Sequence, residues 1–142
     1  MGNYFYDDKG NIKETLLTTE AKLWAESFIK PARSKDRYQN NPPLNMTQLR
    51  KFHIEVKTLD NRLKALGNAE KRFLEQKPIV KMLKAKVAYA CPTKGKRKVP
   101  EEFRKYIEEM VDKIDNWKDF QAFSLCFESV VGYFVGEGGR IK

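Results

Sequence analysis

The chain is poor in the residues from which catalytic and metal sites are usually built. Its 142 residues include two cysteines and one histidine, His53. Cys91 and Cys126 are far apart and no CxxC pair occurs, which argues against a structural zinc site. With a single histidine, any Cys–His or Ser–His catalytic pair would have to include His53. We therefore expect no catalytic residue, no metal site and no cofactor.

Long apolar runs and glycine-rich loops are missing as well. No segment approaches the ~18 consecutive apolar residues of a membrane span, and the first fourteen residues lack the apolar core of a signal peptide. The EGG sequence near the end follows a predicted helix instead of preceding one, so it does not match a phosphate-binding loop. Two sparse cysteines without an export signal predict a reducing, cytoplasmic location and no membrane partner.

Positive charge is abundant, and it is segregated along the chain. Residues 1–43 carry a net charge of +1, whereas residues 44–98 hold fifteen basic and four acidic side chains, a net of +11. Residues 99–142 carry a net of −3. Charge selected only for solubility has no reason to gather in one third of a chain. The distribution favours a polyanion-binding face in the middle third.

Apolar residues recur at helical spacing throughout, and no convincing strand alternation occurs. The sequence therefore predicts an all-α protein, a compact bundle of about five helices in a single domain, 1–142. We expect an N-terminal helix over 19–30, a proline-containing linker over 31–44, basic helices over 45–91 and C-terminal helices over 100–135.

Helix ends are marked by polar caps and prolines. Asn45 with Gln48 resembles a capping box, and Asp115 or Asn116 is suited to cap the last helix. Thr18 or Thr19 is suited to cap the first helix, Pro78 to begin another, and Pro100 to begin the first C-terminal one.

The basic side chains form two groups. Along the predicted helices they repeat at steps of three, four and seven, with few acids between them, whereas the loop after Pro92 holds a second, flexible cluster. Such spacing without a recognition-helix motif favours phosphate contacts over base reading. Lys77, Lys81 and Lys84 are expected opposite the apolar face of their helix, where they would make positioned phosphate contacts. The loop cluster is expected to supply only attraction or a contact with a neighbouring subunit. The composition alone does not choose between RNA and DNA as the polyanion. The candidate residues for these phosphate contacts are Arg50, Lys51, Lys57, Lys64, Lys77, Lys81, Lys84, Lys86, Lys94, Lys96, Arg97 and Lys98.

Three other side chains on these helices carry weaker signals. His53 is expected at the edge of the core, turned toward the basic side of its helix. Ile54 points away from the predicted apolar stripe, which is a weak hint of a protein contact. Tyr89 is expected to pack the end of its helix, with stacking on a base as the less favoured alternative.

Five blocks of sequence occur in the order and spacing of a known family. They are TEAKLWAESF, MTQLRKFHIEVKTL, PIVKMLKAKVAYA, VPEEFRKYIEEMVDKI and DFQAFSLCFESVVGYF. In these blocks the chain resembles the small subunit of type III-A CRISPR effector complexes, the Csm complex, from about Thr19 to Phe134.

The resemblance implies a prokaryotic all-helical subunit that is not itself a nuclease. Several copies would stack along the guide RNA filament, opposite the subunits that carry the RNA-cleaving aspartate, and would line the path of the target RNA. The implied partners are guide RNA, target RNA, other subunits and other copies of the same chain. Independently of the resemblance, the apolar helix faces of so short a chain suit an exchange between protomers, which would give a homodimer in isolation. The family's basic motif positions are occupied here by Arg50, Lys51, Lys81, Lys84 and Lys86.

Two hypotheses of different classes follow. The first is a non-catalytic RNA-binding subunit that contacts the RNA backbone through basic side chains. The second is a helical protein-interaction scaffold without direct RNA contact, whose lysines serve acidic partners or solubility.

Overall fold

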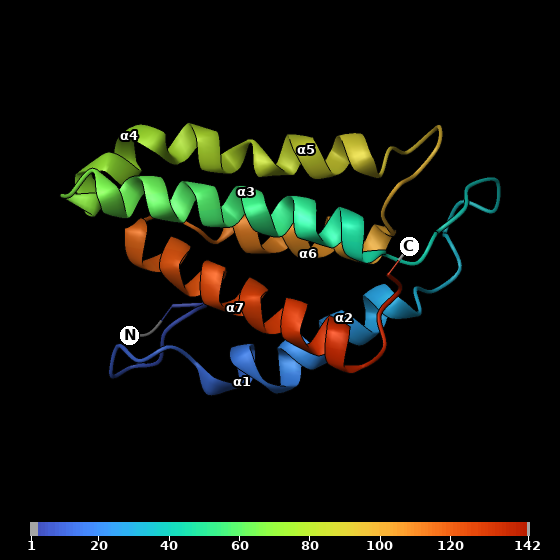
Figure 1. Cartoon of the computed structure of the whole chain (residues 1–142), viewed down its shortest axis with the longest axis horizontal. Coiled ribbons are helices and arrows are strands. Elements are labelled where there is room, and N and C mark those ends of the chain that lie inside the picture. The colour runs from blue at the N-terminus through green and yellow to red at the C-terminus, as the bar shows by residue number, and fades with distance from the viewer. Residues whose placement is uncertain (1–2, 142) are drawn as a thin grey trace.

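The computed structural model describes residues 3–141 and is built from helices (Figure 1). The elements are α1 (Glu14–Leu17), α2 (Thr19–Ile29), α3 (Met46–Ala65), α4 (Ala69–Lys81), α5 (Leu83–Ala90), α6 (Glu101–Asp112) and α7 (Trp117–Gly136). Within residues 3–141 the only extended pairings are isolated bridges, Tyr6 with Ile12 and Asn45 with Arg140. The predicted all-α class is confirmed.

Local capping begins the two longest helices. The Asn45 side chain accepts a hydrogen bond from the Gln48 backbone N–H at 2.9 Å, and Asn116 accepts one from Asp119 at 2.8 Å. Both caps were predicted, and both satisfy backbone donors that a helix start leaves without partners. Thr18 precedes α2 without capping it, because its hydroxyl instead donates to the Glu14 carbonyl oxygen at 3.0 Å.

The prediction that Pro78 begins a helix is wrong. Pro78 lies inside α4, which already starts at Ala69 after a left-handed turn at Asn68, and the helical run breaks only at Met82. Phe73 and Val80 are fully buried on either side of the proline. Their packing keeps the segment helical although proline removes one backbone hydrogen bond. As a result α4 and α5 lie nearly end to end along one side of the bundle (Figure 1).

Aromatic side chains fill the centre of the bundle. Helix α7 packs against α2, α3 and α4, while α5 packs against α6. Phe28, Phe103, Tyr106 and Phe127 are buried and meet at ring-centroid distances of 5.2–6.3 Å, several of them edge to face. Such contacts add about 0.5–1.5 kcal/mol per pair beyond the burial of their area. This aromatic core joins α2, α6 and α7.

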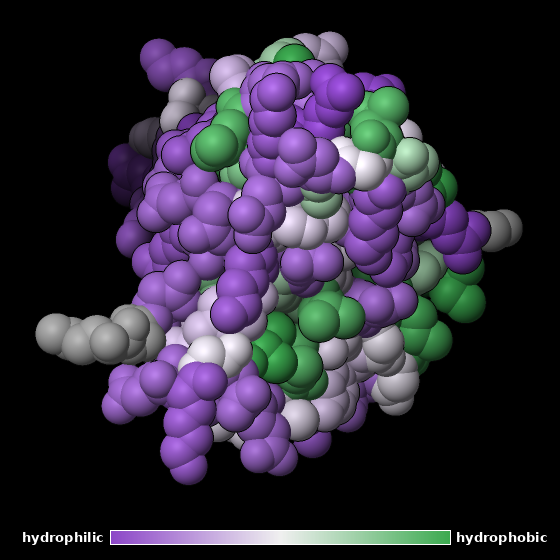
Figure 2. All heavy atoms as spheres, turned by 90° about the vertical axis from the view of Figure 1, so that its left-hand side faces the viewer, coloured by the Kyte–Doolittle hydropathy of each residue, from purple (hydrophilic) through white to green (hydrophobic). Residues whose placement is uncertain are grey.

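The surface of the bundle is mostly hydrophilic at the end where α3 turns into α4. Figure 2 shows this end, with hydrophobic side chains in separate patches among hydrophilic ones. Leu66 and Leu74, from the turn and from α4, are among the exposed hydrophobic residues. No helix in the described part of the chain is both long enough and apolar enough to cross a membrane.

Candidate nucleic-acid interface

The second turn of α3 presents two cations to solvent. Arg50 and Lys51 are exposed, and neither has a hydrogen-bond or ion-pair partner among residues 3–141. Further along the same helix, Lys57 lies 3.5 Å from Glu128 of α7, and Lys64 lies 3.1 Å from Asp60. The candidate cations of α3 are therefore two unpaired ones near its start, Arg50 and Lys51, and two paired ones beyond them.

Three lysines of α4 and α5 contact the carboxyl end of α6 and the residues that follow it. The Lys81 ammonium donates to the Val111 carbonyl oxygen at 2.6 Å, Lys77 lies 3.8 Å from Asp115, and Lys84 pairs with Asp112. Cations at this position complement the partial negative charge of a helix carboxyl end. Burial lowers the pKa of Lys81, as does neighbouring Lys77, against the opposing effect of Asp115 and Asp112.

The expectation that Lys77, Lys81 and Lys84 stand opposite the apolar face as a solvent-facing stripe is therefore wrong. All three are partly buried against α6 and its connection to α7. The residue pattern of one helix shows which side of that helix is apolar. It does not show which neighbouring helix each side faces. These lysines connect α4 and α5 to the carboxyl end of α6 and its connection to α7, whether or not they also contact RNA.

Lys86 is paired across a groove. Its ammonium donates to Oε1 of Glu55 on α3 at 2.7 Å, so the pair bridges α3 and α5. On one side of the bridge lies a hollow of about 390 Å³, and on the other lies a second hollow of about 350 Å³; Glu55 and Lys86 line both. The two hollows thus form one groove between α3 and the α4–α5 row, interrupted by an ion pair.

The loop between α5 and α6 contains one fixed cation and three exposed ones. Lys94 and Lys96 are exposed without partners in the described residues, and the Lys98 ammonium lies 6.0 Å from the centre of the Tyr89 ring. Arg97 is different, since its side chain is only 5% exposed. The predicted flexible cluster therefore contains one immobilised arginine.

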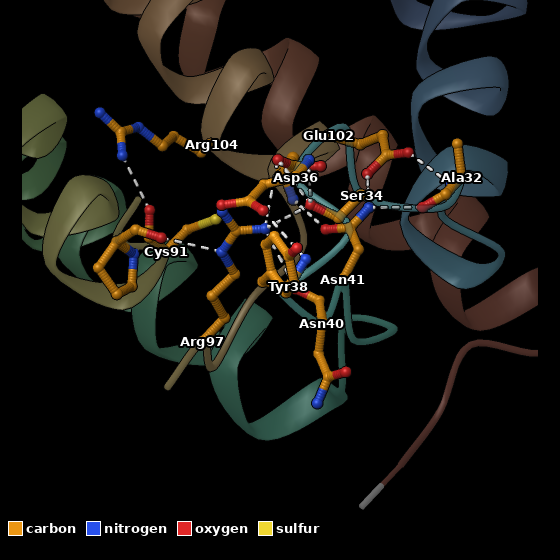
Figure 3. Close-up of polar contacts among 12 residues, drawn as sticks. Ala32, Ser34, Asp36, Tyr38, Asn40, Asn41, Cys91, Arg97, Glu102 and Arg104 are labelled. Atoms are coloured by element: carbon orange, nitrogen blue, oxygen red, sulfur yellow. Dashed lines mark hydrogen bonds and ion pairs between the residues drawn. The ribbon is translucent and has the colours of Figure 1, made fainter. Parts of the chain in front are cut away.

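Arg97 joins this loop to the 31–44 segment (Figure 3). Its guanidinium donates to the Pro92 carbonyl oxygen at 2.9 Å, to the Asn40 carbonyl oxygen at 3.1 Å and to the Ser34 hydroxyl at 3.2 Å. Asn41 continues the network, because its side chain accepts from the Glu101 N–H and donates to Glu102. The segment expected to be a linker is thus tied to the start of α6.

His53 and Ile54 take different environments. His53 is half-buried against Phe127, and its Nε2 has no partner within residues 3–141. Burial lowers the pKa of His53, as does Lys57, while Glu128 opposes them. Ile54 is 56% exposed, as its position off the apolar stripe predicts.

Two residues that line the groove, Tyr89 and Gln48, were not among the candidate site residues from the sequence. Tyr89 was expected to pack the end of its helix, but 82% of it is exposed. It lines the larger hollow together with Gln48, which the sequence identified only as part of a helix cap. The signal available for Tyr89 was its flanking by alanines, Ala88 and Ala90, which gives a large ring little to pack against.

Metal-ligating groups and thiols are the remaining side chains to place. No group of three or more His, Cys, Asp or Glu side chains within residues 3–141 is placed to hold a metal ion. Cys91 and Cys126 are free thiols and both are buried. Burial raises the pKa of Cys91, and it raises the pKa of Cys126 to about 12, so neither thiol is an activated nucleophile.

Comparison with known proteins places the chain in a family. The family model described as Csm2 Type III-A matches residues 22–139, which run from the second turn of α2 past the end of α7. No curated protein and no solved structure matches it. The matched range contains both groups of basic side chains, the groove between α3 and α5 and the Arg97 network. The chain belongs to the Csm2 Type III-A family, the small subunit of type III-A CRISPR effector complexes.

Proposed function

We propose that this chain is a non-catalytic, RNA-binding small subunit that stacks in several copies along the guide RNA–target RNA filament. Each copy contacts the RNA backbone through basic side chains, in the prokaryotic cytoplasm. Membership of the family supports a place in the effector complex. The contact with RNA is supported by the unpaired cations of the middle third.

The observation that carries the proposal is the separation of paired from unpaired cations. Arg50, Lys51, Lys94 and Lys96 are exposed and have no partner in the described residues. Lys51 and Lys98 line the same hollow, so the start of α3 and the α5–α6 loop lie close together. Figure 1 shows both at the end of the bundle where the 31–44 segment also lies. A polyanion contacting this end meets several cations without first breaking an ion pair.

Salt dependence gives the first measurement. Neutralising one phosphate of single-stranded RNA contributes about −0.7 to the slope of log K against log salt. Four phosphate contacts, one for each unpaired cation, predict a slope of roughly −3 for one copy. A single copy is expected to bind weakly, and an assembled row of copies tightly, because linked sites multiply modest affinities.

Charge reversal gives the sharper test. Arg50→Glu with Lys51→Glu is compared with Lys9→Glu and Lys71→Glu, two exposed lysines without partners in the described residues, from the N-terminal segment and the first turn of α4. Both double variants carry the same net charge, so a general loss of attraction affects them equally. We expect RNA binding to fall only in the first and the helical circular dichroism to stay unchanged in both. Equal affinities for the two variants would place the interface elsewhere.

Lys81 and Lys84 are poor choices for charge reversal. A glutamate at position 84 would lie beside Asp112, and one at position 81 would lie beside the carboxyl end of α6. Both changes are expected to weaken the fold, so a loss of RNA binding would not identify a contact. Neutral substitutions at Lys77 and Lys84 show whether these lysines reach RNA in addition to α6.

The scaffold hypothesis is favoured by a different observation. Leu66, Leu74 and Met82 are each about half exposed or more, on and around α4. A subunit that stacks on its neighbours needs apolar contacts, and the same residues suit a homodimer of the free protein. An RNA–protein crosslink map of the assembled complex separates the hypotheses. Crosslinks within 50–57 and 81–98 support RNA contact, and their absence in a normally assembled complex supports the scaffold.

A further inference from the structure

The larger hollow of the groove combines an apolar wall with exposed cations. Phe52, Ala85, Ala90 and the Tyr89 ring line it, together with the side chains of Lys51 and Lys98. Its volume of about 390 Å³ lies within the range of about 300–1,000 Å³ that is typical of small-molecule sites. A surface built only to attract phosphates needs no such hollow.

The charges around the hollow are unequal. Glu55 is its one acidic lining residue, and Glu55 is already paired with Lys86 at 2.7 Å. Lys51 on α3 has no partner in the described residues, and the Lys98 ammonium has only the face of the Tyr89 ring, at 6.0 Å. Two positive charges therefore remain available, one from each side of the hollow, for a negatively charged occupant.

Tyr89 supplies an open aromatic face. It is 82% exposed, so it adds little to the core, and it stands at the last turn of α5 beside the small side chains of Ala85 and Ala90. Phe52, which is buried, closes the hollow on the side of α3. Base-on-aromatic stacking tolerates any sequence, since every nucleobase has a π face. The open ring and the small neighbours leave space for one planar group.

We propose that this hollow holds one unpaired nucleotide of RNA, with its base stacked on Tyr89 and its flanking phosphates at Lys51 and Lys98. The inference rests on the proposed RNA-binding function and narrows its ligand to a single-stranded or locally unpaired strand. A base within a duplex keeps both faces covered by its neighbours and cannot enter. The hollow adds affinity for a base to a surface that otherwise attracts phosphate.

The full-length chain is titrated at low salt with three RNAs of equal length: single-stranded oligoadenylate, the same backbone with abasic riboses, and a blunt duplex. We expect the single strand to bind at least about fivefold more tightly than the abasic strand, as stacking of one base implies. Tyr89→Ala is expected to remove that difference and Tyr89→Phe to keep it. Because Tyr89 is 82% exposed, its truncation leaves the fold intact.

Tyr38→Ala is the matched control. Tyr38 is 80% exposed and also carries a cation near its ring, Arg37 at 4.9 Å, but it lies in the 31–44 segment outside the hollow. Its truncation is expected to leave all three affinities unchanged. A second readout is photocrosslinking of iodouridine-labelled RNA in the assembled complex, with the crosslinked residue expected at Tyr89.

The outcomes separate this inference from the function on which it rests. Equal affinities for the oligoadenylate and the abasic strand, unaffected by Tyr89→Ala, would overturn the stacking site while leaving phosphate binding in place. Preference for the duplex would overturn it as well. Failure to bind any of the three RNAs, joined by absence of crosslinks in the assembled complex, would overturn both.

Discussion

Arg97 should be the basic side chain on which stability depends most, although the sequence places it in a run of lysines. We predict that Arg97→Met lowers the free energy of unfolding by about 3–5 kcal/mol. The side chain is 5% exposed and donates to the carbonyl oxygens of Pro92 and Asn40. A hydrogen bond from a charged donor contributes about 1.5–3 kcal/mol, and its loss leaves each carbonyl without that donor.

The ion pair with Glu101 adds less. The Arg97 Nη1 and Glu101 Oε2 atoms lie 3.2 Å apart, but the Glu101 side chain is 34% exposed. Solvent therefore weakens the attraction, and we assign the ion pair a contribution of less than about 1 kcal/mol. The predicted loss is a large share of the 5–15 kcal/mol by which typical domains are stable. It corresponds to a fall in Tm of roughly 10–17 °C for a chain of this length.

Urea unfolding followed by circular dichroism measures the effect. Lys96→Met is the control, because Lys96 is one residue away, exposed and without a partner in the described residues; its change is expected within about 0.5 kcal/mol. Arg97→Lys keeps the charge but loses the planar fork that reaches three acceptors, so an intermediate loss is expected. If Arg97→Met and Lys96→Met unfold within about 1 kcal/mol of each other, the network of Figure 3 does not stabilise the fold as argued.

The same network predicts where the molecule opens first. In the parent, Arg97 and Asn41 hold the 31–44 segment against the start of α6. Trypsin cleavage at Arg33, Lys35 or Arg37 should therefore accelerate in Arg97→Met and stay unchanged in Lys96→Met. Mass spectrometry of the early fragments identifies the cleavage sites. Equal cleavage rates would show that the segment is held by other contacts.

Three further predictions concern buried polar groups. The Tyr106 hydroxyl is buried without a hydrogen-bond partner in residues 3–141. Tyr106→Phe should therefore stabilise the fold by about 1 kcal/mol, which thermal unfolding would show as a Tm higher by roughly 3 °C. A lower Tm would reveal a partner for the hydroxyl. Because burial lowers the pKa of His53, the unfolded chain binds a proton that the folded chain resists, so stability should fall as pH drops below about 6.5. His53→Gln should flatten that dependence in urea unfolding between pH 5.5 and 7.5, and an unchanged slope would exclude His53 as its source. Cys126, whose pKa burial raises to about 12, should resist iodoacetamide at pH 8 until the chain unfolds, and rapid labelling of the native protein would contradict its burial.

Much of the fold could be predicted because its signals are local. The caps at Asn45 and Asn116 require only residues three positions apart, and the apolar stripes of α3 and α7 repeat within each helix. The failure at Pro78 has the opposite cause. Proline is a helix breaker by local rules, whereas Phe73 and Val80 keep α4 helical through contacts made across the bundle.

The candidate site could be predicted only in part, because the partner of a lysine is a tertiary property. Lys84 and Asp112 are 28 residues apart in the chain, and Lys86 and Glu55 are 31 apart. No spacing rule within one helix identifies such pairs. The sequence indicated that residues 44–98 are strongly basic, but it ranked Lys77, Lys81 and Lys84 above the loop lysines, and their contacts with α6 remove the geometric basis for that ranking.

Ion pairing also determines where uncancelled positive charge remains on the surface. The C-terminal third carries a net of −3, and its Asp112, Asp115 and Glu128 each lie against a lysine of the middle third. Paired charges cancel within a few ångströms, well inside the Debye length of about 8 Å at physiological salt. Among the predicted phosphate-contacting residues, the cations left unpaired therefore lie at the start of α3 and in the α5–α6 loop, beside the hollow that Tyr89 lines. Long-range attraction and the proposed short-range stacking act at the same end of the bundle. An RNA strand attracted by the unpaired cations therefore arrives where one of its bases can stack on Tyr89.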